Sequence, residues 1–157
     1  MDQNALLSRT FVLAEESRSD GDHPFGALLA VDGVIVAEAH NRVNTNRDLT
    51  AHAETRLVRV LEQTHLLSEL PLGTVYASCE PCPMCVGAMF WAGARRVVFG
   101  LSHVGLSELA ALPGADPWGF IISAADIGER AMPPMTFSGP HREDEAAQAH
   151  LSFWVTR

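Results

Sequence analysis

The sequence has no apolar run long enough to cross a membrane, and it is poor in cysteine and in basic residues. Apolar residues make up 47% of its 157 positions, but they occur in short runs, which excludes a membrane span and favours a buried core. The first residues, Met1-Asp2-Gln3-Asn4, lack the basic and apolar regions of a signal peptide. We therefore expect a globular protein of the cytoplasm.

Basic residues are outnumbered by acidic ones. The chain has 11 Lys and Arg against 19 Asp and Glu, which gives a formal net charge of -8. A protein that grips nucleic acid usually presents a basic patch, because phosphate contacts supply much of the affinity. The densest basic pair is Arg95-Arg96, so the sequence leaves room for only a small local basic patch. The charge favours a small uncharged molecule as the partner and argues against nucleic acid.

All three cysteines lie between Cys79 and Cys85. Such crowding does not provide a disulfide framework, and two cysteines separated by two residues are typical of metal or redox chemistry. Cys79 ends a predicted strand, so we expect it to be a buried thiol rather than a metal ligand.

Periodicity and turn residues predict helices that alternate with strands. Residues 4–17 lack Gly and Pro and favour a helix, whereas 25–31 and 34–39 predict two strands joined by a hairpin turn at Asp32-Gly33. Thr50 is the expected N-cap of a second helix. The remaining predicted elements are strands at 74–78 and 97–100, helices at 82–91 and 143–154, and irregular backbone at 41–49 and 105–117. This alternation indicates a single layered α/β domain over residues 1–157.

Two short motifs, His52-Ala53-Glu54 and Pro81-Cys82-Pro83-Met84-Cys85, carry the chemistry. One His and two Cys can supply three zinc ligands and leave a fourth position for water, which is the composition of a catalytic site. Cys82 and Cys85 share a helical face, and the positive start of the helix stabilises thiolates. Zinc would lower the pKa of its bound water toward about 7, and the Glu54 carboxylate could then move protons.

Each motif alone has a simpler explanation. A Cys-x-x-Cys pair is typical of a structural zinc half-site or of a redox pair, and a His-x-Glu triplet at a helix start can simply face solvent. Together, in this order and each at a predicted helix start, the motifs favour one catalytic Zn²⁺ per chain, held by His52, Cys82 and Cys85.

The motifs resemble those of the cytidine deaminase superfamily, in which H-x-E precedes P-C-x-x-C. The resemblance is to the nucleobase branch, which contains guanine, cytosine and tRNA adenosine deaminases. It is carried by Pro24-Phe25-Gly26-Ala27, Asn41, 50–54, 78–85 and Gly87-Ala88-Met89. The resemblance implies a three-layer α/β/α fold with a central mixed five-stranded sheet, assembly as a homodimer, and zinc-dependent hydrolytic deamination.

The resemblance also implies roles for residues near the metal. Glu54 would protonate a ring nitrogen and the departing amine, and Asn41 would hydrogen-bond the base. Phe25 would form a wall against the ring, and the backbone of Ala53 would donate to a substrate carbonyl. Considered alone, Asn41 is explained as a turn residue and Phe25 as a core residue.

Three features of the sequence bear on which base is bound. Phe90-Trp91-Ala92 resembles the aromatic-Trp-Ala of guanine deaminases, and Glu80 and Asp116 stand where those enzymes carry acids that contact the substrate. Packing in the core would also explain Trp91, and a turn would explain Asp116. A guanine-like base is therefore the first choice.

The C-terminal segment departs from that pattern. Related guanine deaminases close the site with a terminal Tyr, but the only Tyr here is Tyr76, in a predicted strand. Trp154, Glu143 or Glu145 would have to substitute, and residues 140–157 are predicted to form a lid over the site. The alternative is that Phe153 and Trp154 anchor the last helix to the core.

The missing Tyr leaves room for cytosine, isocytosine or a triazine as the substrate. A tRNA adenosine deaminase is a further alternative, which the net charge disfavours. An alternative of another class is a non-catalytic zinc module that binds a ligand, and the presence of Glu54 argues against it.

Overall fold

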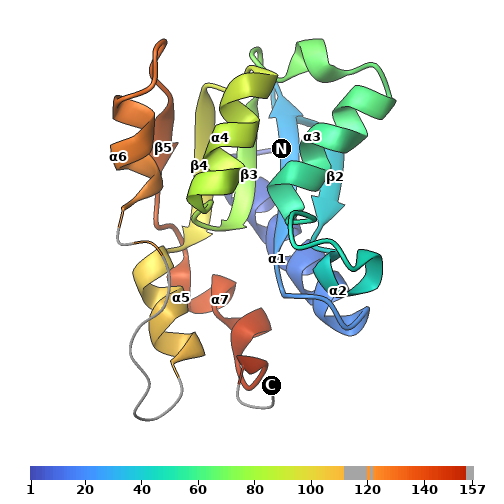
Figure 1. Ribbon diagram of the computed structural model, residues 1–157, viewed down its shortest axis with the longest axis vertical. Coiled ribbons are helices and arrows are strands. Elements are labelled where there is room, and N and C mark those ends of the chain that lie inside the picture. The colour runs from blue at the N-terminus through green and yellow to red at the C-terminus, as the bar shows by residue number, and fades with distance from the viewer. Residues whose placement is uncertain (112–119, 121, 155–157) are drawn as a thin grey trace.

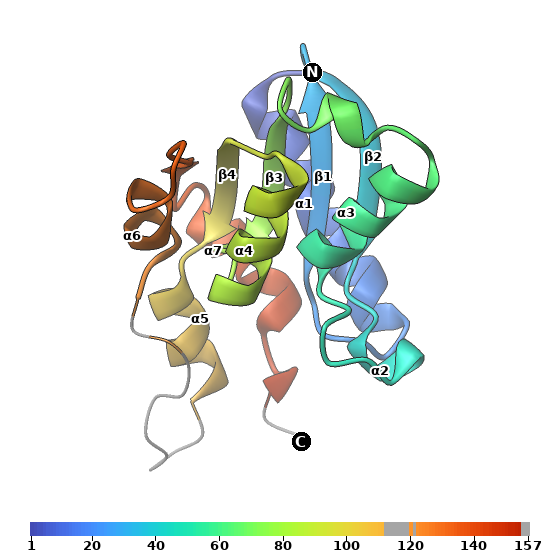
Figure 2. The same cartoon turned by 45° about the horizontal axis from the view of Figure 1, so that its top comes forward.

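The computed structural model describes residues 1–111, 120 and 122–154 of the chain. A five-stranded sheet forms its centre. The order of its strands is β2 (Val34–His40), β1 (Gly26–Val31), β3 (Thr74–Cys79), β4 (Arg96–Leu101) and β5 (Thr136–Ser138). The first two strands pair antiparallel, as do β1 and β3, whereas β3–β4 and β4–β5 are parallel. Helix α1 covers one face of the sheet, and α3 and α4 cover the other (Figures 1 and 2). The predicted three-layer fold with a mixed sheet is confirmed.

The N-terminal half follows the local sequence signals closely. Strands β1 (Gly26–Val31) and β2 (Val34–His40) form the predicted hairpin. Asp32 and Gly33 both adopt positive φ, of 49° and 75°, as a tight two-residue turn requires. A Cβ atom on Gly33 would lie 2.7 Å from the carbonyl oxygen of Met1, so no other residue fits there without a shift.

Helix α1 (Gln3–Ser19) begins where Asp2 accepts a hydrogen bond from the Ala5 N–H at 2.8 Å. Its buried side chains, Leu6, Leu7, Thr10, Leu13, Ala14 and Ser17, recur at helical spacing. At Gly26 a Cβ atom would lie 2.4 Å from the Cβ of Leu13, so the missing side chain lets the helix approach β1 closely.

The other face carries α3 (Ala53–Gln63) and α4 (Pro83–Ala92), with β3 (Thr74–Cys79) and β4 (Arg96–Leu101) beneath them. The apolar side chains of these helices meet the sheet in the main core. Its members include Leu57, Leu61, Val86, Met89, Ala27, Leu29, Val75 and Val97. The N-cap of α3 is His52, not Thr50 as predicted, because the Thr50 N–H and hydroxyl both bond to Asp48 Oδ1 in the preceding turn. The metal motif therefore begins the helix.

The segment 41–49 is not wholly irregular as predicted, because it contains the short helix α2 (Val43–Asn46). Asp22 makes this helix possible. Its carboxylate accepts the backbone N–H groups of Asn44 and Thr45, at 2.7 and 2.9 Å, which lie in the first turn of α2. A single 3₁₀ turn, η1 (Leu67–Glu69), connects α3 to β3.

The C-terminal half departs further from the sequence predictions. Helix α5 (His103–Ala110) occupies much of a stretch predicted to be irregular, because Ser102 caps it by accepting from the Gly105 N–H at 3.0 Å. Helix α6 (Ala124–Glu129) and strand β5 (Thr136–Ser138) were not anticipated at these residues. The helix has only six residues and the strand only three, which is too short for a periodic pattern in the sequence to indicate either element.

The predicted helix 143–154 is broken. It consists of α7 (Glu143–Ala146) and the 3₁₀ turn η2 (Gln148–His150), after which Leu151 is extended and Ser152 has a φ of 59°. The ring of Phe153 then contacts His23, and that of Trp154 contacts both His23 and Phe25, which a continued helix would not allow. In the described part of the chain, no helix combines the length and hydropathy that a membrane span needs.

Candidate active site

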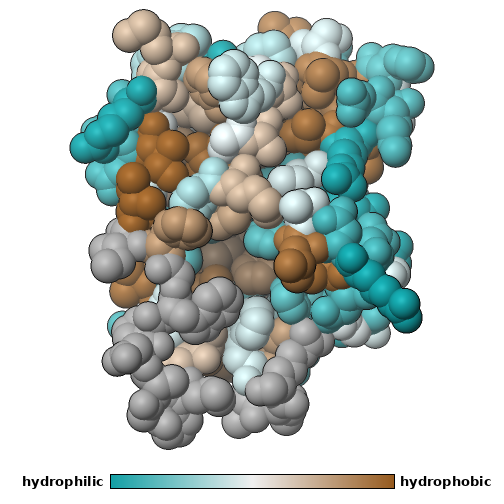
Figure 3. Space-filling model, in the orientation of Figure 1, coloured by the Kyte–Doolittle hydropathy of each residue, from teal (hydrophilic) through white to brown (hydrophobic). Residues whose placement is uncertain are grey.

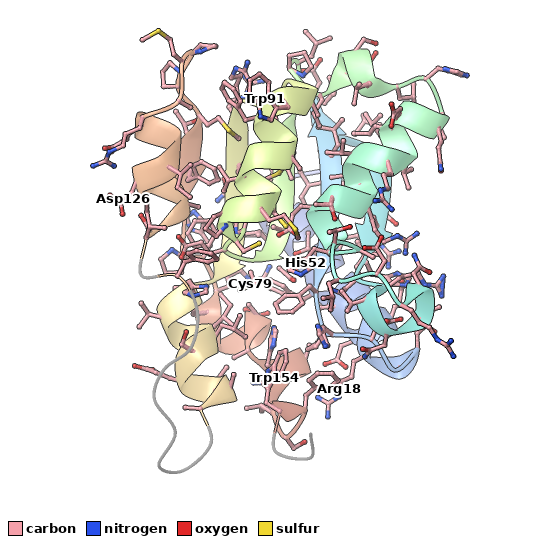
Figure 4. The ribbon with its side chains drawn as sticks, in the orientation of Figure 1. Arg18, His52, Cys79, Trp91, Asp126 and Trp154 are labelled. Carbon is pink, nitrogen blue, oxygen red and sulfur yellow. The ribbon has the colours of Figure 1, made fainter. Side chains whose placement is uncertain are left out.

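Three metal-ligating side chains meet where α3 and α4 begin. His52 immediately precedes α3, Cys82 immediately precedes α4, and Cys85 lies in the first turn of α4. Figure 4 shows the His52 ring beside sulfur atoms at this end of the helices. The motif that ends β3 thus continues directly into the helix that carries the sulfurs. Two segments separated by the strand β3 therefore present one His and two Cys to a common point.

The spacing of the three atoms fits zinc. The Nδ1 atom of His52 lies 3.7 Å from the Cys82 Sγ and 3.6 Å from the Cys85 Sγ, and the two sulfurs are 3.6 Å apart. Nitrogen and sulfur ligands of a single tetrahedral zinc ion stand about 3.6–3.8 Å from one another. Among the described residues, this is the group that could hold a metal ion. The donor set and its geometry therefore suit one zinc ion with an open fourth position.

Without a cation, the three ligands share protons. The hydrogen bond from Cys85, helped by that from His52, lowers the pKa of the Cys82 thiol to about 4. The same hydrogen bond raises the pKa of Cys85 well above its ordinary value, with burial adding to the effect. Contact with Cys82 raises the pKa of His52. A divalent cation in this position would replace those protons, which is the usual coupling of metal binding to ligand deprotonation.

Glu54 lies in the first turn of α3, two residues after His52, and is only 7% exposed. Burial raises the pKa of its carboxyl group, and the negative charge of the Cys82 thiolate raises it further. A raised pKa makes the carboxylate a stronger base and brings the group closer to the condition in which it can both accept and donate a proton at neutral pH. The residue thus has the position and the environment of a proton shuttle.

A cavity of about 430 Å³ opens beside these residues. In Figure 3 a hollow with an apolar floor is visible on this face of the molecule. His52, Glu54 and Cys82 contribute the metal side of the wall. The rest of the lining is mostly apolar or aromatic and includes Phe25, Leu49, Met84, Leu106, Phe120 and Trp154. No Lys or Arg lines the cavity among the described residues, so this surface offers no cation for a phosphate group.

Residues 1–101 match the sequence profile of the cytidine and deoxycytidylate deaminase zinc-binding region. The chain belongs to this family. It is therefore a hydrolytic deaminase with a zinc-binding region, and its His/Cys/Cys cluster is the group among the described residues that could hold the ion.

Named relatives agree with the assignment to this family. A probable cytosine deaminase of Schizosaccharomyces pombe is 39% identical over 151 residues, which are 96% of this chain and 91% of the relative. The guanine deaminase of Bacillus subtilis is 39% identical over 109 residues, 69% of this chain and 70% of that protein. The X-ray structure of the Bacillus enzyme superimposes with a TM-score of 0.64 at 38% identity, covering 74% of this chain and 73% of that one.

The structure brings some predicted substrate contacts of this deaminase to the cavity and leaves others elsewhere. Phe25 lines the cavity and packs edge-on against His150, with 5.1 Å between ring centroids. Ala53 is fully buried and is not part of the cavity lining, but it lies between His52 and Glu54, which are, and as the first residue of α3 its N–H has no acceptor within the helix. Trp154 also lines the cavity.

Asn41 is fully buried and is not part of the cavity lining. Its Oδ1 accepts a hydrogen bond from the Val43 N–H at 3.0 Å, which is the turn role that its position also suggested. Its Nδ2 has no hydrogen-bond partner in the described structure. A buried donor in this state costs free energy unless a further acceptor satisfies it.

Glu80 lines the cavity, but its carboxylate is engaged by backbone groups. One oxygen accepts the His103 N–H at 3.0 Å and the other the Ala124 N–H at 2.9 Å. These are the first residues of α5 and α6. Glu80 therefore fastens the starts of both helices to the segment that carries Cys82.

Three further predicted residues, Trp91, Glu143 and Glu145, lie away from the cavity. Trp91 is 85% exposed and sits at the end of α4 opposite the cluster, as Figure 4 shows, with its ring edge-on to Phe90. Glu143 accepts from the N–H of Ser102 at 2.9 Å and from its hydroxyl, so it supports the cap of α5 and does not cover the cavity. Glu145 pairs with Arg142 on the surface. Asp116 lies outside the described residues.

The sequence reasoning missed two histidines that line the cavity, His23 and His103. His23 directly precedes the Pro24-Phe25-Gly26-Ala27 motif, so its place next to that motif was an available signal. His103 carried no local signal, because it reaches the cavity only through the order of the strands and the turn that follows β4. Imidazoles in an otherwise apolar wall can donate to or accept from a heterocycle edge.

Proposed function

We propose that this deaminase hydrolyses the exocyclic amine of a free nucleobase or a similar aminated ring, with zinc as an essential cofactor and a guanine-like ring as the first choice. The observation that carries the proposal is the position of the cavity. It places a mostly apolar wall, suited to a flat ring, directly beside the His/Cys/Cys cluster and Glu54. The lack of a basic residue in the described lining favours a free base over a nucleotide.

In the proposed reaction His52, Cys82 and Cys85 hold the metal. Bound zinc would supply the nucleophile by lowering the pKa of a water molecule, which attacks the carbon that bears the amine. Glu54 takes the proton that the water gives up and passes it to the adjacent ring nitrogen. It then takes the proton of the hydroxyl now bonded to that carbon and delivers it to the amine. The C–N bond breaks, ammonia leaves, and the oxygen stays on the ring as a carbonyl.

The ring would be oriented by the walls of the cavity. Phe25 and Trp154 offer aromatic faces on which a planar heterocycle can stack. The Ala53 N–H would be a donor for a ring carbonyl, and the Nδ2 of Asn41, which has no partner in the described structure, would be a second donor. His23 and His103 are further candidates for contact with the polar edge of the ring.

The substrate test is ammonia release from a panel of guanine, adenine, cytosine, isocytosine and aminotriazines, with Glu54→Gln as the inactive control. We expect turnover of at least one free base, with guanine best. A preference for cytosine or a triazine would change the proposed substrate but keep it within the class of free aminated rings. Turnover of tRNA but of no free base would replace the proposal with the tRNA adenosine deaminase alternative.

The tRNA alternative has a separate test. A net charge of -8 disfavours tRNA binding, so a gel-shift assay at modest salt should show no complex. The non-catalytic zinc module is no longer an alternative, because the chain belongs to a family of deaminases.

A homodimer is part of the proposal. Trp91 is a large aromatic side chain at 85% exposure, and aromatic residues are enriched at protein interfaces. Sedimentation of the wild type and of Trp91→Glu tests this assignment. A dimeric wild type and a monomeric variant are the expected outcome.

A further inference from the structure

The C-terminal segment of the described chain is tied to the first helix by one side chain. Arg18, in the last turn of α1, donates from Nη1 to the carbonyl oxygens of Ala149 and Leu151, both at 2.9 Å. Its Nη2 donates to the Ser152 hydroxyl at 3.3 Å. Figure 4 shows Arg18 beside the segment that carries Trp154. A single guanidinium therefore bonds to Ala149 within η2 (Gln148–His150) and to Leu151 and Ser152, which follow it.

The backbone of this segment needs such a partner. Leu151 is extended and Ser152 is left-handed, so the chain leaves the helical path just after η2 (Gln148–His150). Carbonyl groups at a helix end have no N–H donor within the helix and require a donor from elsewhere. Guanidinium is well suited, because its planar fork offers five N–H donors in fixed directions.

The tied segment leads directly to a wall of the cavity. Trp154 lines the cavity, and its ring lies parallel to His150, with 6.1 Å between centroids, and 5.6 Å from the ring of His23. The Trp154 indole N–H points to His150 Nδ1 at 3.4 Å. Burial, and then the positive charge of Arg18, lower the pKa of His150 to about 4, so its imidazole is neutral and Nδ1 can accept.

We propose that Arg18 is a positioning residue for substrate binding, which fastens residues 149–152 so that Trp154 keeps its place in the cavity wall. Arg18 itself neither lines the cavity nor contacts the metal cluster. It acts through Trp154. The kinetic part of the test rests on the proposed function, whereas the structural part does not.

The kinetic test compares Arg18→Ala with Arg18→Lys on the best base of the panel. We expect Arg18→Ala to raise KM about tenfold with kcat within about twofold of wild type, because binding is affected and the chemistry is not. A Lys ammonium can reach both carbonyl groups, so Arg18→Lys should stay within about threefold of the wild-type KM. Arg9→Ala is the matched control, because Arg9 also extends from α1 but bonds to Glu16 and Glu38.

A second measurement does not depend on activity. Backbone hydrogen exchange of residues 149–154 should accelerate about tenfold in Arg18→Ala and stay at the wild-type rate in Arg9→Ala. In a double-variant cycle, Arg18→Ala should raise KM no further once Trp154→Ala is present. If no free base is turned over, the exchange measurement alone still decides the role of Arg18.

Three results would overturn the proposal: unchanged KM and exchange in Arg18→Ala, a loss of kcat or zinc in place of a rise in KM, or full additivity with Trp154→Ala. If Arg18→Ala does not fold, Arg18→Gln takes its place in each comparison. Gln keeps a donor but cannot span the three acceptors, so it should show the same direction of change.

Discussion

At the residue scale, Glu54 carries the proton transfers of the proposed reaction. Its carboxyl group is buried beside the zinc ligands, where burial raises its pKa. Glu54→Gln keeps the size of the side chain but cannot exchange protons. We expect it to retain zinc and the fold while kcat falls by at least about 10²–10⁴-fold, the usual contribution of general acid–base catalysis. Steady-state ammonia release measures kcat, and metal analysis of the same sample measures the zinc content. Activity within tenfold of wild type would remove Glu54 from this role.

The zinc ligands provide the second prediction at this scale. Protein purified without added metal should contain one zinc per chain, and the double variant Cys82→Ala/Cys85→Ala should contain none, because one imidazole cannot hold the ion alone. Cys79→Ala is the matched control, since Cys79 is buried at the end of β3 and is not in the ligand cluster. Mass spectrometry of the metal measures the zinc content of the wild type and of the double variant. Zinc retained in full by the double variant would place the metal elsewhere.

At the scale of elements, Glu80 connects the metal motif to the starts of α5 and α6. Its two oxygens accept the N–H groups of His103 and Ala124. Glu80→Gln replaces one acceptor with an NH₂ group that faces an N–H donor. We expect a loss of about 1–3 kcal/mol in the free energy of unfolding, as for a buried donor left without its acceptor.

Urea unfolding measures this loss. Glu129→Gln is its control, because Glu129 is exposed in α6 and its substitution should change the free energy of unfolding by less than about 0.5 kcal/mol. If both variants are equally stable, the bonds from Glu80 contribute nothing measurable to the attachment of α5 and α6.

At the scale of the whole molecule, the pH dependence of stability should reflect His150. Burial and the charge of Arg18 lower its pKa from 6.5 to about 4 in the folded protein. Between these two pH values the unfolded chain binds a proton that the folded chain does not. The free energy of unfolding should therefore fall as pH falls from 6.5 to 4, by up to about 3 kcal/mol, and His150 should have no effect above pH 6.5.

The comparison with His150→Asn isolates this contribution, because carboxyl groups also titrate in acid. Asn offers an oxygen near the position of Nδ1 and does not titrate, so the stability of the variant should fall less over the same pH range. His65→Gln, at an exposed His, should follow the wild type. Parallel curves for wild type and His150→Asn in urea unfolding would contradict the assignment.

Local sequence signals specify each half of the metal cluster and most of the N-terminal half of the fold. Cys82 and Cys85 share a face because they are three residues apart at one helix start, and His52 and Glu54 lie together at another. The meeting of the two halves, 30 residues apart in the sequence, depends on the packing of α3 against α4. The hairpin at Asp32-Gly33 depends on two residues that accept positive φ. Contacts within one turn do not depend on how distant segments pack against it, so a pattern in the sequence can reveal them.

The walls of the cavity depend on contacts between segments that are far apart in the sequence. Arg18 binds carbonyl groups 131 and 133 residues later, and Glu80 reaches a helix start 44 residues away. Neither Arg18 nor Ala149 carries a local signal of this contact. The last predicted helix ended early because Phe153 and Trp154 gain contacts with His23 and Phe25 that a continued helix would forgo. Such contacts depend on the order of strands in the sheet, which brings distant segments together and so overrides local periodicity.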